Sequence, residues 1–580
     1  MQLLARMQKK QWHILPADNR ADELARSLKV SSLLAQVLIN RGVNDLDTAS
    51  SFIRPKLTEL ISPELMPGAN EAVSRIKQAI QKNEKITVYG DYDVDGITGV
   101  AILHAILKML DANVDFYIPH RIDEGYGLNP DAIESLAKSG TNLLITVDCG
   151  IGAVETAKLA ENLGLDLIIT DHHQPTKQLP KAAAIVHPAM DKVYKNQDSA
   201  GAMVAFKLAW ALTNEFNAGK KLSPELRDFM INATSLAAMG TIADVMNLCG
   251  ENRILTNYGL KTLSQCKLSG IQALIEVAGL QGRGLDSFHI GFRLAPMLNA
   301  AGRMGHARLA VELLTSDSQI RSIKIAQYLK EQNTLRQQCE KKILKQACDM
   351  IIKQNLNHPD QKSIVVAGDN WHTGVVGIVA SRIIDRFYRP TIIINTANGI
   401  AQGSARSIEG FDILAAVTAC SDNLISFGGH KMAAGITLEN NKIEDFVADF
   451  EAYAKENVNG DNLTAKLRID AQIKLSQLKI PVVTELQMLE PFGQGNPKPL
   501  FATKGVRLAS PPKRVGAKQA HLQLAVTDNT NTIRCIGFGM GKYEKKLLEH
   551  EFFNVAYQPD INTFNGTCSV QLVLKDIQFE

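Results

Sequence analysis

The sequence feature that most constrains the fold is a short apolar stretch that runs directly into three alternating aspartates. Residues 86–90 (ITVYG) are mostly apolar and partly β-branched, and Asp91, Asp93 and Asp95 follow at every second position. Residues 97–110 (ITGVAILHAILKML) then predict a helix that is almost wholly apolar on one side. The three acids therefore lie where a strand is followed by a helix. In open α/β sheets, this is the edge at which ligands bind.

The crowding of these acids indicates a bound cation. Three neighbouring carboxylates repel one another, and a cation is the usual reason for a chain to keep them together. The same Asp-x-Asp-x-Asp-Gly pattern also begins an EF-hand calcium loop, which needs a bidentate glutamate at its twelfth position. That position is Ile102, inside the predicted helix, so the EF-hand is excluded. Considered alone, the stretch still allows a solvated acidic turn without function.

Three more segments with apolar runs lead to acids or histidines, and their polar ends are Asp148, Asp171-His172-His173 and Asp244. A lone histidine pair is more often structural than metal-binding. Here the pair ends an apolar strand while other strand ends offer aspartates, and this combination favours a metal site. Alternating strands and helices predict a parallel, doubly wound sheet, which brings the strand-end acids to one edge.

The types of these residues indicate the chemistry. Aspartate and histidine without cysteine favour Mn²⁺ or Mg²⁺ over structural zinc. Carboxylates from four separate loops can hold two ions. Two such ions suit phosphodiester hydrolysis, because they generate a hydroxide at neutral pH and neutralise charge on the transferring phosphate.

The chain of 580 residues is too long for one hydrophobic core. Its pattern predicts a helical N-terminal cap on the next domain, a strand–helix lobe, a long charged helix, a second α/β lobe and a region of short strands typical of an OB-like β-barrel. The expected boundaries are 1–80 for the cap, 81–317 for the catalytic domain, 318–358 for the connecting helix, 359–459 for the second lobe and 465–580 for the barrel.

Bulk composition narrows the class of protein without naming a substrate. The net charge is only +3, so a nucleic-acid partner has to show as a local patch. Residues 491–527 form such a patch, with six basic residues, Lys513 and Arg514 among them, and no acidic one. On an OB barrel this run can follow a phosphate backbone, although a solvated loop is the alternative. The sequence lacks Gly-x-x-x-x-Gly-Lys-Ser/Thr, so ATP-driven unwinding is not expected.

Cysteine use and hydropathy bear on location. The eight cysteines are scattered without a Cys-x-x-Cys pair, which fits a reducing cytosol. We find neither a signal peptide nor an apolar run long enough for a membrane span, and therefore expect a cytoplasmic protein.

Three later motifs complete the pattern: residues 293–305 (RLAPMLNAAGRMG), expected to form a loop, 403–407 (GSARS) and 427–435 (FGGHKMAAG). With the strand-end acids, they resemble the DHH phosphoesterase superfamily, and within it the bacterial exonucleases specific for single-stranded DNA. The resemblance extends from about residue 50 to the end of the sequence. The chain ends soon after the predicted barrel, so the further C-terminal domain of some longer relatives is expected to be absent.

This resemblance implies a two-lobed DHH phosphoesterase with a DHH-associated domain and an OB-fold, which degrades single-stranded DNA from the 5′ end in repair and recombination. It implies a two-metal Mn²⁺ or Mg²⁺ site with the ligands Asp93, Asp95, Asp148, His172 and Asp244. Asp148 would bridge the ions, and Asp91 would be an additional or outer ligand. Asp171 would orient its neighbours, and His173 would contact the scissile phosphate. The residues expected to hold the 5′-terminal nucleotides are Arg121, Arg303, Ser404, Arg406 and His430.

Two alternatives remain beside the exonuclease. A DHH phosphoesterase for short oligonucleotides or cyclic dinucleotides would not need the basic barrel. A non-catalytic DHH relative that only binds DNA, as in the eukaryotic replicative helicase, would be expected to have lost acids that are all present here. The resemblance names single-stranded DNA as the partner, with a single-stranded-DNA-binding protein and a DNA helicase as further candidates. It implies a monomer and no membrane partner.

Overall fold

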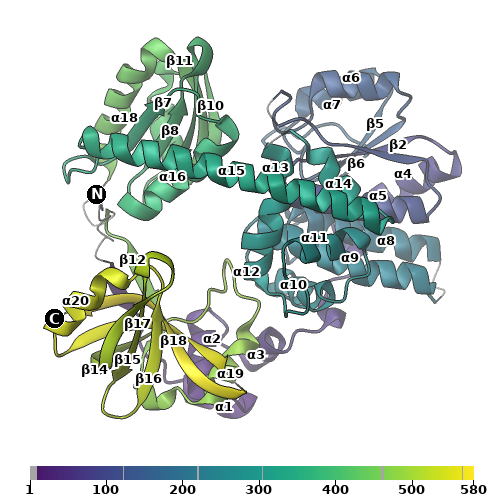
Figure 1. Ribbon diagram of the computed structural model, residues 1–580. Coiled ribbons are helices and arrows are strands. Elements are labelled where there is room, and N and C mark those ends of the chain that lie inside the picture. Colours follow the sequence, from purple (N-terminus) through teal and green to yellow (C-terminus); the bar gives the residue numbers. More distant parts are fainter. Residues whose placement is uncertain are drawn as a thin grey trace. The chain divides into compact units, whose positions relative to one another are not determined.

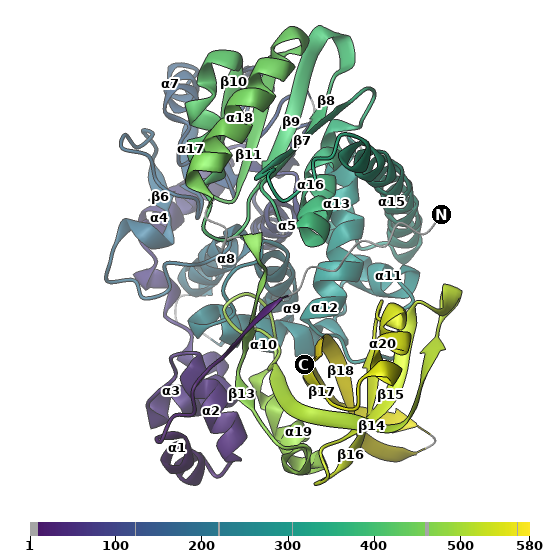
Figure 2. The same ribbon diagram turned by 90° about the vertical axis from the view of Figure 1, so that its left-hand side faces the viewer.

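The computed structural model (Figure 1) describes residues 10–121, 123–217, 221–303, 305–458, 463–564 and 566–579. The chain divides into two compact units: one contains Ile14–Glu331 and Ile469–Glu580, and the other contains the residues up to His13 and Gln332–Arg468. Figure 2 shows the same ribbon diagram turned by 90° about the vertical axis. Among the described residues, no helix is both long and apolar enough to cross a membrane.

The first lobe is built on a sheet of five parallel strands in the order β3-β2-β4-β5-β6. Its strands are β2 (Ile86–Gly90), β3 (Val114–Tyr117), β4 (Leu143–Val147), β5 (Asp166–Thr170) and β6 (Ala184–Val186). After β3 the chain crosses back over β2 to form β4, so the strand order reverses between β2 and β4. In such sheets the crevice at this reversal is the ligand site. The parallel, doubly wound sheet expected from the sequence is therefore confirmed.

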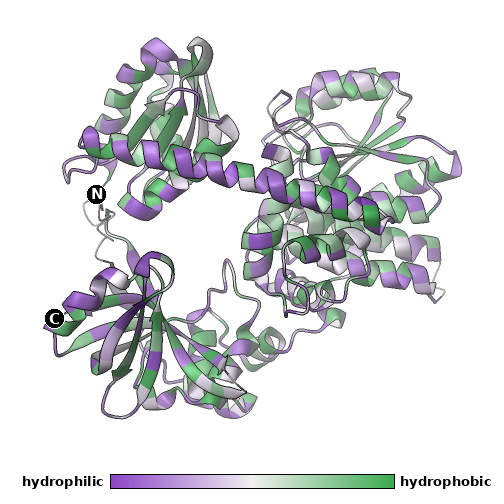
Figure 3. Ribbon diagram, in the orientation of Figure 1, coloured by the Kyte–Doolittle hydropathy of each residue, from purple (hydrophilic) through white to green (hydrophobic). Residues whose placement is uncertain are grey.

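Helices cover both faces of this sheet, and alternate strand residues face them. Val88 and Ile145 share a core with α4 (Ala69–Gln81), α5 (Val94–Met109), α8 (Gly201–Asn217) and α9 (Pro224–Ala243). Tyr89 and Leu144, one residue away, pack instead against α6 (Pro130–Lys138) and α7 (Val154–Asn162). Strands β2 and β4 in the middle of the sheet are buried along their whole length and mostly apolar, as parallel strands covered on both sides require. Figure 3 colours the ribbon by hydropathy, with hydrophobic residues in green.

The remaining helices of the first lobe are α10 (Gly250–Leu263), α11 (Ser269–Val277), α12 (Ser287–His289), the π-helical turn η4 (Ile290–Leu294), α13 (Ala295–Arg303) and α14 (Ala307–Thr315). The expectation of a loop at 293–305 is therefore wrong for the part described. Alanine is the best helix former, and Gly302 lets α13 approach the backbone of the first lobe. A Cβ at Gly302 would lie 2.6 Å from the carbonyl oxygen of Tyr92. Met304 of this motif lies outside the described residues.

A single helix, α15 (Gln319–Lys353), leads from the first lobe to the second, close to the expected connecting helix. The second lobe contains a five-stranded sheet in the order β10-β11-β9-β8-β7. Its strands are β7 (Ile364–Gly368), β8 (Thr391–Asn395), β9 (Ile400–Arg406), β10 (Ser426–His430) and β11 (Ala433–Glu439). Only β7 and β8 pair in parallel. Its helices are α16 (Thr373–Phe387), α17 (Ile413–Ala419) and α18 (Ile443–Asn457).

The C-terminal region is a barrel-like sheet in the order β13-β14-β15-β16-β18-β17, with β14 also paired to β17. Its strands are β13 (Ala471–Gln472), β14 (Phe501–Val515), β15 (His521–Thr527), β16 (Thr532–Gly537), β17 (Phe553–Phe564) and β18 (Thr567–Phe579). The barrel is expected to begin at residue 465. The strand found there, β12 (Lys466–Ile469), pairs instead with β1 (Gln11–Ile14) in a separate two-stranded sheet. The expected end of the second lobe, residue 459, lies outside the described residues.

The first helices of the chain belong to the core of this barrel. The helices α1 (Ala21–Leu28), α2 (Ser32–Asn40) and α3 (Leu46–Ile53) share one hydrophobic cluster with the barrel strands. We had expected this segment to cover the following α/β domain, and only its last helix, α4, packs on the first sheet. The apolar residues of α1–α3 are buried against barrel residues more than four hundred positions later in the chain, which a local pattern cannot reveal.

Arg253 of α10, in the first lobe, binds the backbone of both the N-terminal helical segment and the segment that precedes β14. Its side chain is buried, and its guanidinium donates hydrogen bonds to the carbonyl oxygens of Phe52 (2.7 Å), Leu489 (2.8 Å), Met488 (3.1 Å) and Glu490 (2.8 Å). It also lies 3.9 Å from the centre of the Phe52 ring. A planar fork with five donors suits this set of acceptors, and lysine could not replace it.

We expect Arg253→Met to lower the free energy of unfolding by on the order of 3 kcal/mol, because four carbonyl groups at least partly buried each lose a donor. Calorimetry of the whole chain measures the change as a lower unfolding temperature. The matched control is Arg227→Met on α9, since Arg227 is exposed. An unfolding temperature for Arg253→Met equal to that of the control would contradict this role.

Candidate metal centre

The acids predicted from the sequence meet at the carboxyl edge of the first sheet. Asp91 follows β2, Asp148 follows β4, and Asp171 begins the segment after β5, while Asp244 ends α9. Asp93 begins α5, where one carboxylate oxygen accepts the backbone N–H groups of Asp95 (2.9 Å) and Gly96 (3.2 Å). The strand ends and two helix termini thus set the positions of these side chains.

His172 lies at the centre of the cluster. Its Nε2 atom lies 3.0 Å from Asp148 Oδ1, 3.6 Å from Asp244 Oδ2 and 3.7 Å from Asp95 Oδ2. Three overlapping groups bring their ligand atoms within 4.8 Å of one another: Asp91 with Asp93 and Asp148, Asp95 with His172 and Asp244, and Asp148 with His172 and His173. Asp148 and His172 belong to more than one group, an arrangement that suits two adjacent ions.

Several atoms in the cluster lack the partners that burial normally demands. Asp91 Oδ1, Asp148 Oδ1 and His172 Nε2 are buried and have no hydrogen-bond partner. The His172 ring does hydrogen-bond with the backbone of Ser199, and this orients the ring. Buried polar atoms without partners are costly and call for an explanation such as a bound ion. Carboxylate oxygens with an imidazole nitrogen are a donor set that Mn²⁺ and Mg²⁺ accept.

Burial and mutual repulsion shift the protonation of the cluster. Burial, together with the charge of Asp93, raises the pKa of Asp91 to about 8 and that of Asp244 to about 7. Burial and the neighbouring carboxylates raise the pKa values of Asp95 and Asp148 well above the ordinary value. The charged forms are thus disfavoured without a cation.

The two histidines differ in protonation. Burial and the adjacent His173 lower the pKa of His172 to about 4, so its ring is neutral. For His173, burial lowers the pKa, but the hydrogen bond to Asp171 and the charges of the neighbouring acids together outweigh it, so the net shift is upward. The Asp171 Oδ1 atom lies 2.8 Å from Nδ1 of His173 and accepts the backbone N–H groups of both histidines, while Oδ2 accepts that of Ile151. Burial raises the pKa of Asp171, but these hydrogen bonds hold it below the ordinary value. Asp171 therefore orients the histidine pair.

Two glycines permit the close packing around the acids. A Cβ at Gly201, the first residue of α8, would lie 2.7 Å from the Cβ of Asp148. A Cβ at Gly240 of α9 would lie 2.5 Å from Asp95 Oδ1. The N-terminus of α8 also donates the N–H groups of Gly201 (2.6 Å) and Ala202 (2.9 Å) to Asp95. This fixes Asp95 and favours its charged form.

The residues predicted to hold nucleic acid fall into three places. Arg121 lies 4.7 Å from the centre of the Tyr92 ring, beside the acids. Arg303 is the last residue of α13. In the same helix, Asn299 Oδ1 accepts a hydrogen bond from the N–H of Val94 (3.1 Å), beside Asp93 and Asp95 in the sequence. Both arginines therefore belong to the unit that carries the metal cluster.

The other unit carries Ser404, Arg406 and His430. Nη1 of Arg406 donates to Ser404 Oγ (2.9 Å) and to the carbonyl oxygen of Ala405 (2.8 Å). Both side chains face α16, since a Cβ at Gly377 would lie 2.8 Å from Arg406 Nη2 and 2.9 Å from Ser404 Oγ. His430 ends the exposed edge strand β10.

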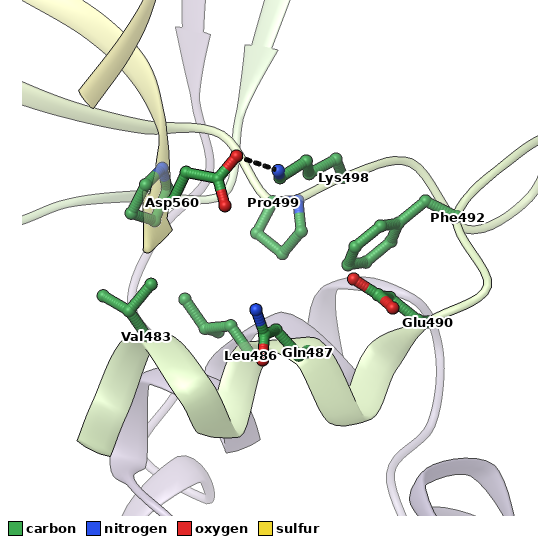
Figure 4. A pocket seen from close by; sticks show the side chains of 9 residues that line it. Val483, Leu486, Gln487, Glu490, Phe492, Lys498, Pro499 and Asp560 are labelled. Carbon is green, nitrogen blue, oxygen red and sulfur yellow. Dashed lines mark hydrogen bonds and ion pairs between the residues drawn. The ribbon is translucent and has the colours of Figure 1, made fainter. Parts of the chain in front are cut away.

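The basic run of the barrel is less uniform than the sequence suggests. Lys513 is exposed on β14. Its neighbour Arg514 forms an ion pair with Glu544 (2.7 Å), and Lys498 pairs with Asp560 (3.1 Å). The sequence has no acid near these positions along the chain, so the pairs could not be read from it. A pocket beside Lys498 is lined by the apolar side chains of Val483, Leu486 and Phe492 (Figure 4) and contains none of the predicted metal ligands.

Sequence reasoning missed Tyr126, Asn299 and Gly201. The Tyr126 hydroxyl donates to the carbonyl oxygen of Asp148 (3.1 Å) and lies beside His173. The sequence marks Tyr126 only by the two glycines on either side of it, which predict a turn before the helix α6. Asn299 and Gly201 act through backbone contacts that only the folded chain reveals.

Comparison with family models matches three segments of the chain. The DHH family N-terminal domain matches residues 85–234, the DHHA1 domain residues 360–456 and the RecJ OB domain residues 469–576. These matches cover both lobes and the barrel region and agree with the expected fold class.

Similar proteins cover nearly the whole chain. A single-stranded-DNA-specific exonuclease RecJ of Bacillus subtilis (strain 168) is 38% identical over 98% of this chain and 71% of its own length. The crystal structure of RecJ in complex with Mn²⁺ from Thermus thermophilus has a TM-score of 0.84 at 30% identity, covering 98% of this chain and 80% of that one. The corresponding complex with Mg²⁺ has a TM-score of 0.78 at 29% identity, covering 98% and 78%. The chain belongs to the RecJ family of single-stranded-DNA-specific exonucleases.

Proposed function

We propose that the protein hydrolyses phosphodiester bonds of single-stranded DNA from the 5′ end, with Mn²⁺ or Mg²⁺ as cofactor, in DNA repair and recombination. The observation that carries this proposal is the set of overlapping ligand groups that share Asp148 and His172 at the switch point of the sheet. Membership of the RecJ family supports the substrate. Digestion of 5′-labelled and 3′-labelled single strands, beside duplex, tests the polarity and the substrate together.

The chain's own residues divide the work of hydrolysis. Asp93, Asp95, Asp148, His172 and Asp244 would hold the two ions, with Asp148 shared between them and Asp91 as an additional or outer ligand. Bound there, the ions would supply a hydroxide at neutral pH and neutralise charge on the phosphate. Asp171 holds His172 and His173 in place through their backbone N–H groups. His173, the more exposed of the two rings, would contact the scissile phosphate and support the leaving group.

The same proposal assigns the binding of DNA. Arg303 and Arg121 would hold phosphates near the metal centre. Ser404, Arg406 and His430 would bind the 5′ terminus. Lys513 would follow the backbone of the strand on the barrel. Arg514 contributes less than its charge suggests, because Glu544 partly neutralises it.

The proposed location, partners and oligomeric state follow from the resemblance to the RecJ family. The free state of all eight cysteines supports action in the reducing cytoplasm. A single-stranded-DNA-binding protein and a DNA helicase are the proposed partners, and the proposed form is a monomer. The competing activity on short oligonucleotides or cyclic dinucleotides is not favoured, since a barrel that matches the RecJ OB domain follows the two lobes.

We expect Asp148→Asn to lower the rate of hydrolysis by about 1,000-fold or more, because the shared ligand of a two-metal site supports a transition-state stabilisation of several kcal/mol. Release of nucleotides from a labelled single strand measures the rate. Asp115→Asn is the matched control. Asp115 lies on β3 of the same sheet, but near the amino end of its strand, whereas the metal cluster lies at the carboxyl ends. Near-normal turnover of Asp148→Asn in saturating Mn²⁺ would contradict the two-metal assignment.

We expect Mn²⁺ to stabilise the protein more at pH 8 than at pH 6. Folded carboxyl groups with a raised pKa bind more protons than the unfolded chain does between about pH 4 and their folded pKa, so metal-free stability falls as pH rises. For Asp244 and Asp91 this interval reaches about 7 and about 8. A cation must displace these protons, and its affinity therefore rises with pH. His172 is already neutral and adds nothing above pH 5.

The shift of the unfolding temperature on addition of Mn²⁺ measures this effect at both pH values. Asp148→Asn serves as the control and should show a much smaller shift at either pH. A shift in the native protein that does not depend on pH would contradict the assignment of the raised pKa values to the metal ligands.

We expect Arg406→Ala to reduce the preference for a 5′-phosphate over a 5′-hydroxyl end by roughly 10- to 150-fold, because hydrogen bonds to charged groups contribute about 1.5–3 kcal/mol. The ratio of kcat/KM for the two substrates measures the preference. Arg382→Ala is the control, since Arg382 lies on the nearby α16 but pairs with Glu340. Equal losses for both kinds of end would count against the proposed role.

A further inference from the structure

Asp148, the acid shared between ligand groups, has an unusual backbone. Its φ is +63°, a left-handed conformation that few residues other than glycine adopt. Such conformations persist where the surroundings hold them in more than one way. The Asp148 N–H donates to the carbonyl oxygen of Thr170 (3.0 Å), which fixes one side of the residue. Its own carbonyl oxygen accepts a hydrogen bond from the Tyr126 hydroxyl (3.1 Å).

Tyr126 reaches this carbonyl from a different loop, which connects β3 to α6. The flanking residues Gly125 and Gly127 have φ values of +79° and +92°, which bend the chain sharply on either side. The loop is anchored near its tip, because the Tyr89 hydroxyl donates to the carbonyl oxygen of Gly127 (2.9 Å). At its start, Glu124 accepts the Tyr117 hydroxyl (2.7 Å). The position of the Tyr126 hydroxyl is thus set independently of Asp148.

The same hydroxyl touches His173. Its oxygen lies 3.1 Å from Nδ1 and 3.4 Å from Nε2 of that ring. The two rings meet edge to face, with centroids 5.5 Å apart. One hydroxyl group therefore contacts the backbone of the shared ligand and the side chain proposed to face the phosphate. Tyr126 still exposes 53% of its surface, so its ring does not serve as core packing.

We infer that Tyr126 is a positioning residue: its hydroxyl holds the left-handed Asp148 peptide and the His173 ring in the arrangement that binds the divalent cations. This inference rests on the proposed function for its effect on hydrolysis, but its effect on metal binding does not depend on DNA. The competing explanation is that the exposed ring only stacks on a nucleotide. The hydroxyl distinguishes the two, because a stacking ring does not need it.

The variants follow from this distinction. Tyr126→Phe keeps the ring and removes the hydroxyl, whereas Tyr126→Ala removes both. The matched control is Tyr194→Phe, which removes a tyrosine hydroxyl of the same unit that donates to Glu251 (2.9 Å), an acid outside the metal cluster. Unfolding temperatures of all three variants check that they fold.

The first measurement is Mn²⁺ binding to the whole protein without DNA, by calorimetric titration or by the spin resonance of free Mn²⁺. Removing an outer partner of a metal ligand typically weakens binding or activity 10- to 100-fold. We expect Tyr126→Phe to weaken Mn²⁺ binding by roughly that factor, and Tyr194→Phe to bind like the native protein. Native Mn²⁺ affinity in Tyr126→Phe would overturn the inference.

The second measurement separates kcat from KM on a 5′-labelled single strand. We expect Tyr126→Phe to lower kcat at subsaturating Mn²⁺, with partial recovery at high Mn²⁺ and an unchanged KM for DNA. A raised KM confined to Tyr126→Ala, with Tyr126→Phe indistinguishable from native, would assign the ring to DNA and overturn the positioning role. If the native protein bound Mn²⁺ but cleaved no single strand, the proposed function would fail while the binding measurement would still test Tyr126.

Discussion

The first lobe depends on keeping several buried carboxylates within a few ångströms of one another. Water cannot screen their repulsion there, and the pKa values of Asp91, Asp95, Asp148 and Asp244 rise accordingly. Two features of the surrounding structure reduce this electrostatic and steric cost. The N–H groups at the start of α8 face Asp95, and glycines remove side chains that would push the acids apart. These features do not neutralise the negative charge of the carboxylates, and a divalent cation does.

The metal cluster could be predicted because strand ends are visible in a sequence. Apolar runs followed by Asp148 or by Asp171, His172 and His173 point to one edge of a parallel sheet, and no long-range information is needed. The motif at 293–305 was misassigned for a related reason. Its glycine and proline suggest a loop, but close packing against the backbone of Tyr92 rewards a helix with small side chains. Tertiary contacts decide such cases, and local propensity does not.

Other parts of the site could not be predicted, because they rest on partners distant in sequence. Arg514 forms an ion pair with Glu544, thirty residues later in the chain, and this acid partly neutralises the positive charge of the basic run. Tyr126 reaches the backbone of Asp148 from a turn whose sequence carries no charge signal. The sequence of α1–α3 predicts a cap on the next domain, yet their apolar residues share a core with a barrel at the other end of the chain. In each case the residue that decides the structure lies at a distant position in the sequence.

The shared core of α1–α3 and the barrel has a consequence for synthesis of the protein. These helices leave the ribosome first, but their partners, from Ile473 onward, are made some four hundred residues later. At typical translation speeds the delay is roughly 20 to 80 seconds. During that time the apolar faces of α1–α3 have no native surface to cover them, while the first lobe between them can already fold. The N-terminal helices are therefore the part of the nascent chain most exposed to chaperones and to misassembly.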